Sequence, residues 1–175
     1  EKKDSDVVII DIDEQSLGKF GQFPWNRRVF AKILDQLNIH NPKAIGFDIF
    51  FTEKDKQSPE AIIKSYGLIP SDVADIQNLK SPDDIFSEKL KDSKSIIAVL
   101  GSNVPSHTNY NRKAKARFLS KGGDPKDFTY SYPHSIGSLE KLEKNVKGLG
   151  SISFLDQLDG IIRSLPLIVQ FDKKI

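Results

Sequence analysis

The chain has 175 residues, of which 38% are hydrophobic and 29% are charged, so it is long enough and apolar enough to bury the core of one domain. Its formal net charge of +2 excludes the strong basic imbalance that is typical of polyanion-binding proteins. It contains no cysteine, which excludes disulfides, thiol nucleophiles and cysteine-ligated metals. We therefore expect a single domain over residues 1–175.

The N-terminal part of the sequence predicts a strand, a helix and a second strand. The apolar run in residues 7–12 predicts a buried strand that ends in two carboxylates. Apolar residues spaced three and four apart predict an amphipathic helix over residues 27–39. Residues 44–51 predict another buried strand. Because a helix connects them, these two strands are expected to lie parallel in a βαβ unit.

The middle of the chain contains a polar interval and then a second helix and strand. Residues 55–81 are bounded by polar and proline-containing stretches and predict two short helices, near 59–66 and 71–79. Pro82, followed by two acidic residues, is typical of a helix start, and this helix is expected to end near Lys91. Residues 95–100 predict a third strand. We interpret 55–81 as a helical insertion.

The C-terminal part has weaker periodicity. Short helices are predicted around 113–121 and 138–144, and strands over 148–154 and 163–171. Asp159 and Gly160 between those strands indicate an antiparallel hairpin, whose second strand is interrupted by Pro166. The basic residues between 112 and 121 indicate a solvated helix face and no nucleic-acid site. The fold class is therefore α/β, with a mixed sheet, an N-terminal parallel βαβ unit, helices packed on the sheet and a C-terminal antiparallel hairpin.

No apolar run in the chain approaches the roughly 20 residues that a membrane helix needs. The chain begins with Glu1 and ends soon after a strand-like run. We expect it to be a piece of a longer protein.

The carboxylates Asp11 and Asp13 allow two interpretations. An Asp-x-Asp pair after an apolar strand is typical of haloacid-dehalogenase-type phosphatases, in which the first Asp attacks phosphate and the second protonates the leaving group. The paired acids that hold Mg²⁺ in that family have no counterpart at the end of a later strand. In the structural interpretation, Asp11 and Asp159 bond to backbone amides or to one of Arg27, Arg28 and Arg163.

Trp25 is the only tryptophan in the chain, and it follows Phe23 and Pro24 in a loop directly before a predicted helix. We expect it to fill a hydrophobic hollow and to be structural. Asp48 lies toward the end of the strand predicted over residues 44–51 and, like Asp11, allows a functional or a structural interpretation. The three histidines are far apart and show no metal-ligand spacing.

Four blocks in order resemble the CHASE domain, type 2, an extracellular sensory domain of bacterial receptors. The family pattern is an apolar strand with Ile-Asp, a Gly-x-Trp-Pro-Trp-x-Arg segment, a Gly-Phe-Asp strand, and Asp-Gly-x-x-Arg before an apolar strand with proline. Here these blocks end in Asp11, run from Gly21 to Arg27, include Asp48, and run from Asp159 to Arg163. Phe23 stands where the family has its first tryptophan.

The resemblance implies an extracytoplasmic domain, flanked by membrane helices, that senses a small molecule or a physical stimulus for a histidine kinase, cyclase or diguanylate cyclase output. It implies no catalysis, metal or cofactor in this domain and no nucleic-acid partner. A homodimer, a non-sensing dimerisation module and a Mg²⁺-dependent phosphatase are the alternatives. The candidate ligand or structural network residues are Asp11, Asp13, Trp25, Arg27, Asp48, Asp159 and Arg163.

Overall fold

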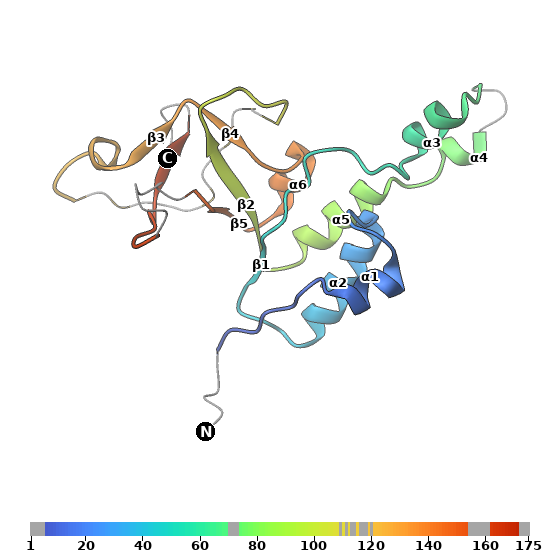
Figure 1. Ribbon diagram of the computed structural model, residues 1–175, viewed down its shortest axis with the longest axis horizontal. Coiled ribbons are helices and arrows are strands. Elements are labelled where there is room, and N and C mark those ends of the chain that lie inside the picture. Colours follow the sequence, from blue (N-terminus) through green and yellow to red (C-terminus); the bar gives the residue numbers. More distant parts are fainter. Residues whose placement is uncertain are drawn as a thin grey trace.

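The computed structural model describes residues 6–69, 74–108, 110, 112, 115, 119, 121–153 and 162–171. Its sheets lie at one end of the molecule, and helices α1, α2 and α5 lie beside them (Figure 1). Helices α3 (Pro59–Tyr66) and α4 (Ala74–Gln77) project from the opposite end. The predicted α/β class with a mixed sheet is confirmed.

Helices α2 and α5 pack against the sheet, α1 precedes them in the chain, and the local sequence explains where all three begin. In α1 (Glu14–Phe20) the Asp13 side chain accepts a hydrogen bond from the N–H of Ser16. In α2 (Arg27–Ile39) the Asn26 side chain caps the first turn. Helix α5 (Pro82–Lys91) starts with proline. The first N–H groups of a helix have no acceptor within it, so the N–H that proline lacks costs no hydrogen bond at this position. The bounds of α2 and α5 agree with the sequence-based prediction.

The central strand is β2 (Ser95–Ser102), and its two halves have different partners. Its first half pairs in parallel with β1 (Ile45–Phe47) on one side and β5 (Gly148–Ser151) on the other. Its last residues pair antiparallel with β4 (His134–Ile136). The strands β3 (Tyr130–Tyr132) and β6 (Val169–Phe171) form a separate parallel pair. The short 3-10 helix η2 (Pro125–Phe128) precedes β3, and α6 (Glu140–Asn145) precedes β5.

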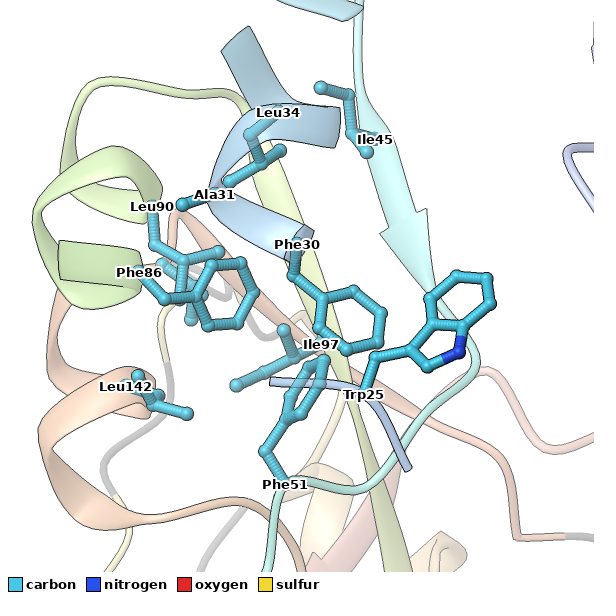
Figure 2. Packing of buried hydrophobic residues seen from close by; sticks show 11 residues of the cluster. Trp25, Phe30, Ala31, Leu34, Ile45, Phe51, Phe86, Leu90, Ile97 and Leu142 are labelled. Carbon is cyan, nitrogen blue, oxygen red and sulfur yellow. The ribbon is translucent and has the colours of Figure 1, made fainter. Parts of the chain in front are cut away.

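Aromatic rings dominate the core between the helices and β2 (Figure 2). Phe30 of α2, Phe86 of α5 and Phe51 after β1 lie with their ring centroids 5.0–5.9 Å apart. Tilted and edge-on contacts of this kind add to the stabilisation from burial alone. The core therefore joins α2, α5 and the segment after β1.

The strand predicted over residues 7–12, and with it the predicted N-terminal βαβ unit, is not present in the structure. Val8, Ile9 and Ile10 expose 82%, 88% and 61% of their surfaces. A strand requires a neighbour that accepts its backbone hydrogen bonds, and an apolar run does not itself provide one. The parallel connection into the central strand runs instead from β1 through α5 to β2.

The predicted C-terminal antiparallel hairpin is also wrong for the described residues. Strand β5 pairs with β2, and β6 pairs with β3, so the two do not pair with each other. Gly148 allows this close approach, because a Cβ there would lie 3.2 Å from Ile96. The second strand is limited to Val169–Phe171, and the turn at 159–160 lies outside the described residues. Most of the predicted helix 113–121 lies outside them too.

Candidate functional site

Trp25 lies in the core beside the start of α2. It is 5% exposed, and its ring contacts those of Phe20, Phe23 and Phe30. The indole Nε1 donates a hydrogen bond of 2.7 Å to the carbonyl oxygen of Gly21. Gly21 has a backbone φ of 85°, a conformation that residues other than glycine rarely adopt. This placement is the one that a structural role for Trp25 requires.

Arg27 is buried at the first position of α2, where it contacts three other segments. Its guanidinium lies 4.6 Å from the ring centroid of Phe51, a cation–π contact. The nitrogens Nη1 and Nη2 donate to the carbonyl oxygens of Trp25 and Glu53. Its Nε lies 3.6 Å from Oδ1 of Asp83, the second residue of α5. Arg27 thus connects α2 with α5 and with the chain after β1.

Asp55 links the same elements through the backbone. Its carboxylate accepts hydrogen bonds from the N–H of Arg27 at 2.6 Å and from the side chain of Asn26 at 3.2 Å. The N–H of Asp55 donates to Oδ2 of Asp83 at 2.9 Å. We call Arg27, Asp55 and Asp83 the Arg27 junction. It contains two buried carboxylates for one arginine, so it carries a negative formal charge.

The Arg27 junction is not fully satisfied. Within the described residues, Arg27 Nε and Asp83 Oδ1 are buried without a hydrogen-bond partner. Burial raises the pKa of Asp83, although the N–H of Asp55 and the charge of Arg27 oppose the shift. Burial also lowers the pKa of Arg27, against the attraction of the two carboxylates. The charged forms of both groups are therefore penalised at this position.

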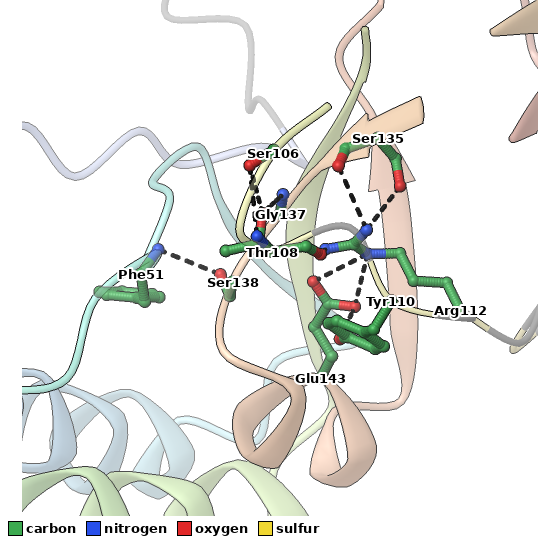
Figure 3. Close-up of polar contacts among 9 residues, drawn as sticks. All are labelled: Phe51, Ser106, Thr108, Tyr110, Arg112, Ser135, Gly137, Ser138 and Glu143. Atoms are coloured by element: carbon green, nitrogen blue, oxygen red, sulfur yellow. Dashed lines mark hydrogen bonds and ion pairs between the residues drawn. The ribbon is translucent and has the colours of Figure 1, made fainter. Parts of the chain in front are cut away.

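A second buried ion pair joins Arg112 to Glu143 of α6 (Figure 3). Arg112 Nε donates to the Glu143 carboxylate at 2.9 Å, and Nη2 donates to the carbonyl oxygen of Thr108 at 2.7 Å. Nη1 donates to the Ser135 hydroxyl. We call Thr108, Tyr110, Arg112, Ser135 and Glu143 the Arg112 cluster. It ties the chain around 108–112 to β4 and α6.

Two further features close the Arg112 cluster. The Tyr110 hydroxyl donates to Glu143, and burial and then this hydrogen bond raise the pKa of Tyr110 far above its ordinary value. Gly137 lies directly against the ion pair, and a Cβ at this position would collide with both Glu143 and Arg112. There is consequently no room beside Gly137 for a ligand while the pair is formed.

The other residues predicted for the site do not join either cluster. Asp11 and Asp48 are exposed, and no hydrogen bond or ion pair is found for them within the described part of the chain. Asp13 caps α1, and its hydrogen bonds with the hydroxyl and N–H of Ser16 lower its pKa. Arg28 donates to the carbonyl oxygen of Lys80. Within the described residues, Asp11 therefore forms none of the expected bonds to Arg27, Arg28 or Arg163.

The predicted pairing of Asp159 with Arg163 stays a prediction. Asp159 lies outside the described residues, and Arg163 is exposed. Sequence reasoning missed Asp55, Asp83, Arg112 and Glu143 as site residues. Asp83 was identified only as an acid at a helix start, and Arg112 only as part of a basic run. Glu143 follows Leu142 at a buried position of α6, which is a detectable but weak signal.

Among the described residues, no three His, Asp or Glu side chains are grouped in a way that could hold a metal ion. An open hollow of about 420 Å³ lies between α3 and α4, lined by Pro59, Glu60, Ile63, Lys64 and Gln77. None of its lining residues belongs to the Arg27 junction or the Arg112 cluster. In the same part of the chain, no helix has the length and apolar character that membrane crossing needs.

The family model described as CHASE2 domain matches residues 1–175, the whole chain. Comparisons with curated proteins and with solved structures found no match. CHASE2 domains are extracellular and sensory, and they are not catalytic. The chain belongs to the CHASE2 family of sensory domains from bacterial receptors.

Proposed function

We propose that the chain is the extracytoplasmic domain of a transmembrane receptor and that it senses a small molecule or a physical stimulus for a cytoplasmic output domain. The observation that carries this proposal is the family match over the whole chain. A histidine kinase, a nucleotide cyclase or a diguanylate cyclase is the kind of output that we propose. The flanking membrane helices are part of the same proposal.

The carboxylates support a sensing role and argue against phosphatase chemistry. Asp13 is occupied as the cap of α1, where its carboxylate accepts hydrogen bonds from the N–H and hydroxyl of Ser16. A phosphatase of the haloacid-dehalogenase type would need both acids at a strand end, together with further acids for Mg²⁺. The buried carboxylates Asp83 and Glu143 are instead paired with arginines that connect different elements.

A sensor needs an element with two arrangements that a stimulus can favour unequally. The Arg27 junction is suited to this task, because it joins α2 to α5 through a contact whose two closest charged atoms are not hydrogen-bonded. A movement of α5 relative to α2 that closes the 3.6 Å gap would satisfy both atoms. We propose this junction as the adjustable contact and the Arg112 cluster as a fixed one.

The extracytoplasmic location can be tested by labelling. The chain contains no cysteine, so a Lys19→Cys variant adds one thiol on the exposed surface of α1. We expect a membrane-impermeant maleimide to label this variant of the receptor in intact cells, with the unsubstituted receptor as background. Labelling only after the cells are lysed would contradict the proposed location.

The sensing role can be tested by thermal denaturation with small metabolites, divalent ions and a range of pH values. A ligand at about 100 times its Kd should add about 2.7 kcal/mol to the free energy of unfolding. Mg²⁺-dependent turnover of a phosphate ester that is abolished by Asp11→Asn would contradict the proposal and support the phosphatase.

A further inference from the structure

The segment Val8–Ile10 is an anomaly on the surface of the molecule. Its three aliphatic residues expose between 61% and 88% of their surfaces, although a run of β-branched residues has the composition of a strand. Single exposed apolar residues are common on protein surfaces, but a continuous exposed run indicates a surface that another element covers. Ile12, two residues further on, already packs against the core cluster.

An open sheet edge lies in the same half of the molecule. Strand β1 pairs with β2, and the described residues contain no strand on its other side. The N–H of Ile45 donates to the carbonyl oxygen of Lys94, so the backbone polar groups of Ile45 face β2. In a parallel ladder the next residue, Gly46, directs its N–H and carbonyl oxygen to the opposite side. These groups are available to a further strand.

The side chains of the segment fit this edge in one orientation. Residues two apart in a strand share a face, so Val8 and Ile10 would follow Ile12 toward the core. Ile45 and Phe47 point to the same side, because both pack in the core cluster. Ile9 would then lie on the opposite face beside Gly46. A Cβ built at Gly46 meets no atom within 4 Å, so there is space for the Ile9 side chain.

We propose that Val8–Ile10 docks in parallel on the open edge of β1 of the same chain, and that this docked arrangement is the more populated one in solution. The segment then completes a sheet in the order Val8–Ile10, β1, β2 and β5. The proposal extends the proposed function, since the docked and undocked arrangements give the sensor two states. Its test measures strand pairing alone, so it can fail while the sensing role stands.

The connection favours docking within one chain over exchange with a second copy. Residues 11–44 link the segment to β1 and contain α1 and α2. A parallel crossover needs a dozen residues or more, usually with a helix, and this link provides both. An intramolecular partner is also present at a high effective concentration.

Cysteine cross-linking tests the docking directly, because the chain has no cysteine of its own. We expect the double variant Ile9→Cys with Gly46→Cys to form an intramolecular disulfide under mild oxidation. It should run as a compact monomer on a non-reducing gel. The matched control pairs Gly46→Cys with Tyr66→Cys, an exposed position on α3, and should give several-fold less cross-linking. A disulfide-linked dimer, or cross-linking no greater than the control, would overturn the proposal.

Hydrogen exchange of the unsubstituted chain provides a second test that does not depend on the variants. In an edge strand only alternate amides face the neighbouring strand, so docking predicts that the amides of Val8 and Ile10 exchange about tenfold or more slowly than those of an unstructured chain. Exchange at the unstructured rate would overturn the proposal, whatever the cross-linking variants do. Dimer formation is excluded separately by measuring the mass of the protein in solution.

Discussion

Among the described residues, two buried arginine–carboxylate pairs are satisfied to different degrees. Arg112 Nε donates to Glu143 at 2.9 Å, and the other guanidinium nitrogens have acceptors as well. Arg27 Nε lies 3.6 Å from Asp83 Oδ1, and neither atom has a hydrogen-bond partner within the described residues. The Arg112 cluster is complete, whereas the Arg27 junction has an unused donor and an unused acceptor.

The difference shows that burial alone does not determine how firmly an ion pair holds the elements that it joins. The free-energy cost of removing two charges from water is offset only when the ion pair has good geometry and its remaining polar atoms are hydrogen-bonded. The Arg112 cluster meets this condition and should hold its elements in one arrangement. The Arg27 junction meets it in part, so a rearrangement there costs less. A stimulus would therefore act more easily on the contact between α2 and α5.

The largest expected effect is at the Arg112 cluster. Glu143→Gln removes the charge that compensates Arg112, whose side chain is only 5% exposed. We expect the free energy of unfolding to fall by about 3–5 kcal/mol, because an unpaired buried charge remains. Urea unfolding measures this loss. Glu140→Gln is the matched control on the same helix, because Glu140 forms an exposed pair with Lys144. An equal loss in both variants would contradict the comparison.

A smaller effect is expected at the Arg27 junction. In Asp83→Asn the amide oxygen can still accept from the N–H of Asp55, and Asp55 still faces Arg27. We expect a loss of about 1–3 kcal/mol in the free energy of unfolding, from an imperfectly satisfied buried group. The neighbouring variant Asp84→Asn, which breaks an exposed pair with Lys141, is the control. A loss at Asp83 larger than that of Glu143→Gln would reverse the comparison.

The pH dependence should identify Asp83 specifically. Burial raises its folded-state pKa above the ordinary value of 3.8. The favourable contribution of the protonated carboxyl is therefore full below 3.8 and is lost as the pH rises through the raised pKa. Relative to Asp83→Asn, the unsubstituted chain should lose stability over this window and then level off. Urea unfolding at a series of pH values measures the difference, and a flat difference would contradict the raised pKa.

The smallest expected effect is at Asp13, which caps α1 on the surface. Hydrogen bonds from Ser16 lower its pKa, so its contribution is present above 3.8 and is lost as the pH falls through the lowered value. Asp13→Ala should cause a small loss of stability at neutral pH that disappears in acid, the opposite direction to Asp83. Thermal denaturation at two pH values measures it. A loss that grows in acid would show that capping is not the role of Asp13.

The sequence was sufficient to predict the elements whose signals are local. The helix Arg27–Ile39 combines apolar periodicity with a capping Asn26, and the helix at Pro82 begins with its own start signal. The strand at 95–100 was predicted from its continuous apolar run, and Ile97, Ala98 and Val99 of β2 are buried in the structure. In each case the residues that decide the structure lie within the element.

The sequence did not predict features that depend on distant partners. The run at residues 7–12 has strand composition, but its pairing depends on an edge formed by residues 45–47. Glu143 and Arg112 are 31 positions apart, and the pair lies outside any periodic pattern. Arg27 was identified as a site residue, but its partner was expected among the strand-end acids. Only the packing of α5 against α2 brings Asp83 to it.

The inequality of the two buried pairs can be measured most directly with two double-mutant cycles under identical conditions. One cycle combines Arg112→Gln with Glu143→Gln, and the other combines Arg27→Gln with Asp83→Asn. The account predicts that the coupling free energy from urea unfolding is larger for Arg112 and Glu143, by about 1 kcal/mol or more. Equal coupling, or stronger coupling between Arg27 and Asp83, would contradict it.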